Sequence, residues 1–176
     1  MTQAVLALGS NLGDRADHLR SAVAALDDWV FVVSGVYETP PWPEGTGGPR
    51  YLNAVILVND PGASARDWLD RARVCEDRAG RVRDPADRNA PRTLDVDVIA
   101  VWTDDDEPVI SDDPELTLPH PRAHLRAFVL RPWIDIQPYA RLPGHGPLTE
   151  LLRDPAVAAD LADVHPRADV ALESAQ

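Results

Sequence analysis

The chain has 176 residues, of which 44% are hydrophobic, and a formal net charge of −12 at pH 7. This length suits one domain with its own core. The negative charge disfavours nucleic acid or an anionic membrane as partner, because their phosphates require a basic surface. A single cysteine excludes an internal disulfide. Since we find neither a signal peptide nor an apolar run long enough to span a bilayer, we expect a cytoplasmic protein.

The cationic residues are unusual in type and in distribution. All 17 are arginine, so a phosphate loop that ends in Gly-Lys-Ser/Thr is excluded. Five of them fall between Arg78 and Arg92, whereas residues 103–115 carry seven acids and no base. A guanidinium group can bind a phosphate with two parallel hydrogen bonds and keeps its charge at any physiological pH. This basic segment is therefore the expected place for any phosphate.

The apolar pattern of the first hundred residues alternates between strand and helix types. A short apolar run predicts a strand that ends at Gly9. The segment after it has apolar residues at helical spacing, which predicts a helix. Two β-rich runs flank a connection rich in proline and glycine at 40–50, and Ser64 and Gly80 bound a second helix. The expected elements are strand 3–9, helix 12–28, strands 30–39 and 51–60, helix 63–80 and strand 92–101.

This β-α-β-β-α-β order predicts an α+β fold with a ferredoxin-like core, in which helices pack on a mainly antiparallel sheet. Beyond Asp113, a proline-bounded turn and short helical patterns predict a C-terminal helical extension. We expect a single domain over residues 1–176, with a loosely ordered tail at about 166–176.

Two carboxylates interrupt the strand at 92–101. Because side chains alternate along a strand, Leu94, Val96 and Val98 point to one face while Asp95 and Asp97 point to the other. Paired carboxylates beside an apolar layer repel each other unless a cation neutralises them. The alternation therefore indicates a metal site, with a solvated edge strand or surface ion pairs as the alternative.

The loop before this strand and the segment after it supply further candidate ligands. Arginines in the loop lie next to the carboxylates, a pairing typical of phosphoryl transfer, although surface pairing with Asp84 and Asp87 would also explain them. The segment 116–128 adds His120, which favours phosphate contact over zinc because a second cysteine is lacking. Tyr51 and Phe128 fit either the core or a stack on a flat ring.

Six segments occur in the order and near the spacing of one enzyme family. They read LGSNLGDR, YETPPW, YLNAV, GRVR, PRTLDVDV and LTLPHPRAHLRAF. On these segments the chain resembles the 6-hydroxymethyl-7,8-dihydropterin pyrophosphokinases of the folate pathway over about residues 3–150. The PRTLDVD and LPHPRAHLRAF blocks are highly specific together, whereas GSNLGD alone is weak.

The resemblance implies transfer of the β,γ-diphosphoryl group of ATP to the hydroxymethyl oxygen of the pterin, with release of AMP. The enzyme would be a cytoplasmic monomer that uses ATP and the pterin, with neither nucleic acid nor membrane as partner. Two Mg²⁺ ions would be held by Asp95 and Asp97. The catalytic residues would be Arg81 and Arg92, the ATP-binding residues Arg83, Arg88, Thr117, His120 and Arg126, and the pterin-binding residues Thr39, Pro40, Trp42, Tyr51, Asn53 and Phe128.

The chain departs from the family pattern just before PRTLD. Asn89 and Ala90 stand where an aromatic residue and a glycine are usual, which removes a stacking surface from the loop. Glu115 and Pro121 are further departures. Two rival hypotheses remain: a catalytically impaired pterin- or nucleotide-binding homologue, and a nucleotide-sugar glycosyltransferase that uses the Asp-x-Asp motif. The second requires a longer chain and leaves the aromatic residues and Asn53 without a role.

Overall fold

The computed structural model describes residues 2–173. Its strands are β1 (Thr2–Ser10), β2 (Val30–Val33), β3 (Tyr37–Thr39), β4 (Tyr51–Asp60), β5 (Asp95–Thr103), β6 (Ser111–Asp113), β7 (Leu116–Leu118), β8 (Arg141–Leu142), β9 (Gly146–Pro147) and β10 (His165–Pro166). Its helices are α1 (Arg15–Ala25), α2 (Ala65–Arg78), the short 3₁₀ helix η1 (Ala123–Leu125), α3 (Ala127–Ile136), α4 (Leu148–Leu151) and α5 (Pro155–Leu161).

The main sheet is antiparallel, with the strand order β10-β3-β4-β1-β5 and with β2 also paired to β4. Taking β2 and β3 as one interrupted strand, the chain runs β-α-β-β-α-β through this order. The predicted ferredoxin-like α+β core is therefore confirmed. The run expected as one strand at 30–39 is divided because residues 34–36 leave the ladder.

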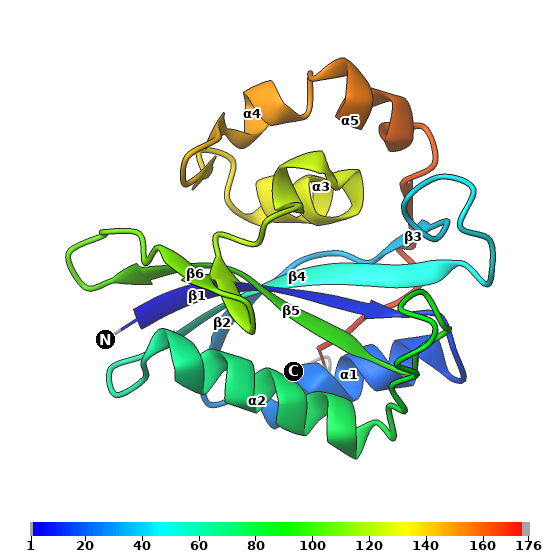
Figure 1. The fold of residues 1–176 in the computed structure, drawn as a ribbon, viewed down its shortest axis with the longest axis horizontal. Helices are drawn as coiled ribbons and strands as arrows, with labels where there is room; N and C mark the ends of the chain where they lie inside the picture. Colours follow the sequence, from blue (N-terminus) through cyan, green and yellow to red (C-terminus); the bar gives the residue numbers. More distant parts are fainter. Residues whose placement is uncertain (1, 174–176) are drawn as a thin grey trace.

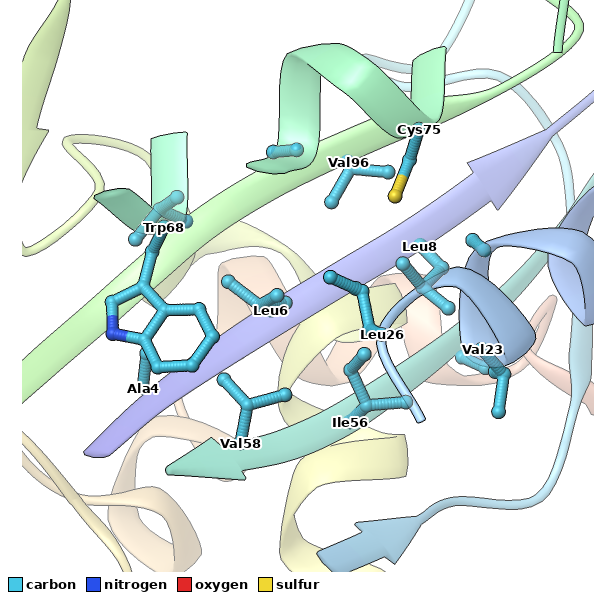
Figure 2. Close-up of a cluster of buried hydrophobic side chains, with 14 of the residues drawn as sticks. Ala4, Leu6, Leu8, Val23, Leu26, Ile56, Val58, Trp68, Cys75 and Val96 are labelled. Carbon is cyan, nitrogen blue, oxygen red and sulfur yellow. The ribbon is translucent and has the colours of Figure 1, made fainter. Parts of the chain in front are cut away.

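Helices cover both faces of this sheet. Helices α1 and α2 lie on one face, and α3 lies on the other with α4 and α5 outside it (Figure 1). Figure 2 shows the first core, where Leu6, Leu8 and Ile56 of the sheet meet Trp68 and Cys75 of α2. The second core forms between α3 and the opposite sheet face, so alternate residues of each central strand supply the two cores.

Helix α2 has well-defined ends. At its start Ser64 and Asp67 form a capping box, in which each side chain binds the other's backbone N–H. Beyond its end Gly80 has φ +70°, a conformation that glycine adopts without strain. The chain therefore turns sharply at Gly80 and enters the arginine-rich loop.

A β-bulge separates the polar and apolar parts of β5. Leu6 of β1 pairs with Val98 and Val5 pairs with Ala100, so Ile99 is the extra residue. Ile99 and Ala100 both join the core under α3, on the face to which Asp95 and Asp97 point. The aspartates thus lie on the α3 side of the sheet, in the part of β5 that precedes the bulge.

Within residues 2–173, none of the helices has the length and apolar character needed to cross a membrane. The predicted C-terminal extension contains α4 and α5, and β10 returns to pair with β3. The single-domain limits and the loosely ordered tail stay predictions. Residues 166–173 of that tail are described, while 174–176 lie outside the described residues.

Candidate active site

Two adjoining cavities open on the α3 side of the sheet. We call the smaller one, with a volume of about 200 Å³, the small cavity, and the other, with a volume of about 1090 Å³, the large cavity. Their shared boundary consists of carboxylates and guanidinium groups: Arg88, Arg92, Asp95, Asp97, Arg122 and Arg126. The acidic half of β5, the edge strand of the main sheet, is therefore the wall between the two cavities.

Arginines neutralise Asp95 from two sides. On one side, Nη1 of Arg81 lies 2.7 Å from Asp95 Oδ1 and also donates to the Leu94 carbonyl. On the other side, Nη1 of Arg92 lies 3.4 Å from Asp95 Oδ2. The Arg81 side chain is only 9% exposed and also pairs with Glu76. Asp95 and Glu76 thus fix Arg81 as a buried charge at the floor of the large cavity.

Asp97 is less well compensated. Its nearest guanidinium is that of Arg126, with Nη1 3.5 Å from Oδ2. Burial and the charge of Asp95 raise the pKa of Asp97 to about 7, against the opposing charge of Arg126. Nε of Arg126 is a buried donor without a hydrogen-bond partner in the described part of the chain. Arg126 alone therefore does not keep the pKa of Asp97 low, and the Nε of Arg126 stays available to an acceptor.

This donor set fits Mg²⁺ bound together with a phosphate. Mg²⁺ is held by one or two carboxylates, with water and substrate phosphates completing its shell. Asp95 and Asp97 provide such a pair, and a phosphate oxygen would satisfy Arg126. Among residues 2–173, no cluster of three or more His, Cys, Asp or Glu could hold an ion by itself. An ion shared with a substrate agrees with that finding.

Away from its charged boundary, the small cavity is lined by aromatic, proline and other uncharged residues. Asn53 is buried, and its Nδ2 donates to the Thr39 hydroxyl at 2.7 Å. A Cβ on Gly9 would lie 3.1 Å from Asn53 Oδ1 and 3.5 Å from the Tyr51 ring, so only glycine leaves the amide and the ring undisturbed. All six residues predicted to bind pterin line this cavity: Thr39, Pro40, Trp42, Tyr51, Asn53 and Phe128.

Arg126 links the two spaces. Its guanidinium carbon lies 5.1 Å from the ring centroid of Trp42 and 5.6 Å from that of Phe128, within the range of cation–π attraction. The same side chain reaches Asp97 in the large cavity. One arginine therefore contacts both the aromatic wall and the carboxylates.

The large cavity is lined by seven arginines and seven carboxylates. All the arginines predicted for catalysis and ATP binding contribute to it: Arg81, Arg83, Arg88, Arg92 and Arg126. His120 joins them, and burial together with the charge of Arg126 lowers the pKa of His120 to about 4. The imidazole is thus neutral at pH 7. Thr117 lines neither cavity, and its hydroxyl donates to the Asp113 carbonyl at 3.0 Å.

Comparison with known proteins identifies the family. The family model for 7,8-dihydro-6-hydroxymethylpterin-pyrophosphokinase (HPPK) matches residues 5–138. The curated 2-amino-4-hydroxy-6-hydroxymethyldihydropteridine pyrophosphokinase of Mycobacterium tuberculosis is 47% identical over 161 residues, which cover 88% of this chain and 84% of the relative. The chain belongs to the HPPK family. Its Pseudomonas aeruginosa relative of the same name is 35% identical, covering 84% of this chain and 88% of that one.

Solved structures agree with the HPPK fold. A Plasmodium falciparum HPPK-DHPS chain aligns with a TM-score of 0.60 and 12% identity, over 85% of this chain and 43% of that one. Another HPPK-DHPS complex with substrates gives a TM-score of 0.56 at 11% identity, with 42% of its chain covered. The present chain thus spans about two fifths of these longer chains. At such identities the similarity supports the fold alone.

Two site residues of this HPPK-family chain were missed by sequence reasoning. Asn11 accepts from the Arg92 N–H at 2.8 Å and donates to the Pro49 carbonyl at 3.2 Å, so one buried amide joins both loops. Glu76 is buried and pairs with Arg81. Arg122, from the segment 116–128 whose histidine and arginine side chains were expected to contact phosphate, lines both cavities. Only the GSN triplet around Asn11 carried a signal, because it stands at the end of a strand that points at the site.

Proposed function

We propose that this protein transfers the β,γ-diphosphoryl group of ATP to 6-hydroxymethyl-7,8-dihydropterin, forming AMP and the pterin diphosphate in folate biosynthesis. The observation that carries the proposal is the pair of cavities that meet at Asp95 and Asp97. One cavity has aromatic walls and a buried amide, and the other has arginines that can bind phosphate beside the carboxylates. A transfer between a flat heterocycle and a polyphosphate needs such neighbouring spaces.

In this proposal the pterin occupies the small cavity. Its ring stacks on Tyr51 and Phe128, and Asn53 reads the donors and acceptors on its rim, with backbone groups of Thr39, Pro40 and Trp42 completing that edge. The hydrogen bond from Asn53 to Thr39 holds the amide in one orientation before the ligand arrives. The hydroxymethyl group is then directed toward the carboxylate boundary.

The triphosphate occupies the large cavity. Arg81 and Arg92 are proposed as the catalytic pair that stabilises charge on the transferred group, with Arg83, Arg88 and Arg126 as further phosphate ligands. Nδ1 of neutral His120 accepts the Arg122 N–H at 3.1 Å, so Nε2 carries the ring proton and can donate one hydrogen bond there. Thr117 is kept as a nucleotide contact on the resemblance alone.

Asp95 and Asp97 are the residues that would hold two Mg²⁺ ions. Ions held there would supply positive charge that compensates the triphosphate and lowers the pKa of the attacking hydroxyl. The chain's own contribution is to hold the acceptor oxygen and the β-phosphorus in line and to compensate the charge of the triphosphate. We further propose a cytoplasmic monomer, because one chain carries both cavities and its single cysteine is buried and free.

The test is formation of AMP from ATP, Mg²⁺ and 6-hydroxymethyl-7,8-dihydropterin, followed by chromatography. We expect AMP and the pterin diphosphate in equal amounts. ADP as the only nucleotide product would contradict a diphosphoryl transfer. Pterin binding without AMP would instead favour the catalytically impaired homologue.

A further inference from the structure

Three arginines from distant parts of the chain meet at the carboxylate of Glu38. Nη2 of Arg15 lies 2.8 Å away, Nε of Arg50 3.6 Å and Nη1 of Arg167 3.0 Å. Arg167 in turn makes two 2.9 Å bonds to Asp169, which hold its guanidinium plane. Burial tends to raise the pKa of Glu38, but the arginines outweigh it and the net pKa is lowered. Glu38 is therefore ionised at neutral pH.

This cluster lies directly behind the small cavity. Glu38 precedes Thr39, and β3 pairs Thr39 with Tyr51 across the sheet. Nη1 of Arg15 also donates to the Arg50 carbonyl at 2.9 Å, and Arg50 is the residue before Tyr51. Both ends of the loop 40–50 are therefore fastened to one carboxylate, while the loop itself supplies Pro40 and other lining groups of the cavity.

The third arginine belongs to a segment beyond the part of the chain that the HPPK family model matches, residues 5–138. This segment, residues 163–172, leaves α5, passes the edge of the sheet at β3 and ends on the α1 side (Figure 1). Its strand β10 pairs with β3, and the Arg167 N–H donates to the Val36 carbonyl at 2.8 Å. Further along, Leu172 is 7% exposed in the core beside α1.

Additional contacts join the segment to both sides of β3. Nη2 of Arg50 reaches the Asp163 carbonyl at 3.5 Å, and Nε of Arg20 donates to the Ala171 carbonyl at 2.8 Å. The segment is thus anchored on α1 and on the loop end, with Arg167 between the two anchors. A stabilising role alone would not require that its charged contacts converge on the strand that carries Thr39.

We propose that residues 163–172 form a clasp in which Arg167 and Glu38 are positioning residues: they hold the loop 40–50 and Thr39 in the geometry that binds the acceptor. This inference rests on the proposed function, since the acceptor of the small cavity is the pterin. The clasp acts on acceptor affinity through preorganisation and has no contact with the reacting atoms.

The first experiment compares Arg167→Ala with Arg153→Ala. Arg153 is an exposed arginine of the same C-terminal extension and lines neither cavity. For Arg167→Ala we expect the KM for the pterin to rise about fivefold, with kcat and the KM for ATP within about twofold of the unchanged enzyme. Arg153→Ala should leave all three constants unchanged. A pterin KM that does not rise, or an equal rise in the KM for ATP, overturns the clasp.

A second comparison separates positioning from a general loss of stability. Because Arg167 and Glu38 act as a pair, the double variant Glu38→Gln/Arg167→Ala should weaken pterin binding no more than the worse single variant. Arg167→Lys keeps the charge but not the planar fork, so its pterin KM should fall between those of the unchanged enzyme and Arg167→Ala. Additive effects in the double variant contradict the pairing.

Hydrogen exchange of the ligand-free protein tests the clasp independently of catalysis. In Arg167→Ala the amides of residues 40–50 should exchange faster, whereas those of α2 should not change. If the amides of residues 40–50 exchange at the same rate in Arg167→Ala as in the protein without substitutions, the inference is overturned. If the protein without substitutions forms no AMP, the proposed function is disproved. The exchange experiment then still decides whether the clasp restrains the loop 40–50.

Discussion

In the small cavity the polar side chains are already paired with each other, whereas in the large cavity the arginines are paired with carboxylates that a phosphate would have to replace. The Asn53 amide bonds to Thr39 and is buried. By contrast, Arg83 pairs with Glu76 at 2.9 Å and its side chain is 63% exposed. A rigid ring is suited to a preformed slot, and a flexible triphosphate is suited to cations that can exchange partners.

The large cavity itself contains fixed and exchangeable cations. Arg81 is 9% exposed between Glu76 and Asp95, so breaking its pairs would leave buried charges uncompensated. Arg83 by contrast is largely exposed, and the buried Glu76 keeps its pair with Arg81 when the contact to Arg83 is broken. Arg83 can therefore turn to a bound phosphate, while Arg81 keeps its place.

The boundary between the cavities should be the most sensitive point. Asp97→Asn removes one metal-binding carboxylate while keeping the shape of the side chain, so we expect AMP formation to fall about 10³-fold. Exposed Asp112 in β6 provides the control Asp112→Asn, which should be neutral. Initial rates of AMP release at saturating Mg²⁺ measure both. Activity near normal in Asp97→Asn would refute the carboxylate-held metal.

A change among the arginines proposed to bind the triphosphate should affect the donor more than the acceptor. Arg92→Ala removes a cation that borders Asp95, and we expect kcat/KM for ATP to fall about 10²-fold. The dissociation constant of the pterin, measured by fluorescence without nucleotide, should stay within about twofold. A matching loss of pterin affinity would mean that the two cavities are not separate in function.

The converse change tests the small cavity. Asn53→Ala removes the buried amide that reads the ring and leaves the Thr39 hydroxyl without its donor, so pterin affinity should fall by about 10- to 100-fold. The KM for ATP should not change. Asn59→Ala, at the far end of the same strand β4, is the matched control. Calorimetric titration with the pterin distinguishes the two variants.

The smallest effect concerns the stability of the protein without ligands. Because the folded-state pKa of Asp97 is raised to about 7, the native state resists ionisation of this carboxyl, and stability falls as pH rises from the unfolded pKa of about 4 through 7. Asp97→Asn removes this loss. We expect the variant to be more stable than the unchanged protein by about 1–2 kcal/mol at pH 8.

The same substitution should bring little or no gain at pH 4, where the carboxyl is protonated in the native state. Urea denaturation at the two pH values measures the difference. A gain that is equal at both values would show that charge at position 97 is not its cause. Excess Mg²⁺ with ATP should remove the advantage at pH 8, since the bound cation then compensates the carboxylate.

Local periodicity was sufficient for β5 and for the ferredoxin-like order. Alternation along one strand gives the shared face of Asp95 and Asp97 without tertiary information. Other site residues depend on contacts between distant segments. Asn11 meets Arg92 across 81 positions, and Glu38 meets Arg167 across 129. Neither separation leaves a pattern in a single sequence.

Glu76 illustrates a second limit. It lies on α2 among charged residues, where a carboxylate ordinarily faces water. It is buried because the loop after Gly80 folds back and places Arg81 against it. The position of Thr117 was likewise beyond local reasoning, since the β6–β7 hairpin directs its hydroxyl to Asp113. Sequence pattern identifies the face of an element, whereas tertiary folding decides what covers it.

The arginines in the wall of the large cavity have a chemical consequence. The positively charged side chains of this wall at pH 7 are all guanidinium groups, because the chain contains no lysine. Guanidinium keeps its proton under any condition in which the protein is folded, so these positive charges do not change with pH. It also offers no side-chain amine to acetyl donors or amine-reactive labels. Neutralisation of a lysine charge, a common means of switching phosphate-binding proteins off, therefore has no target in this wall.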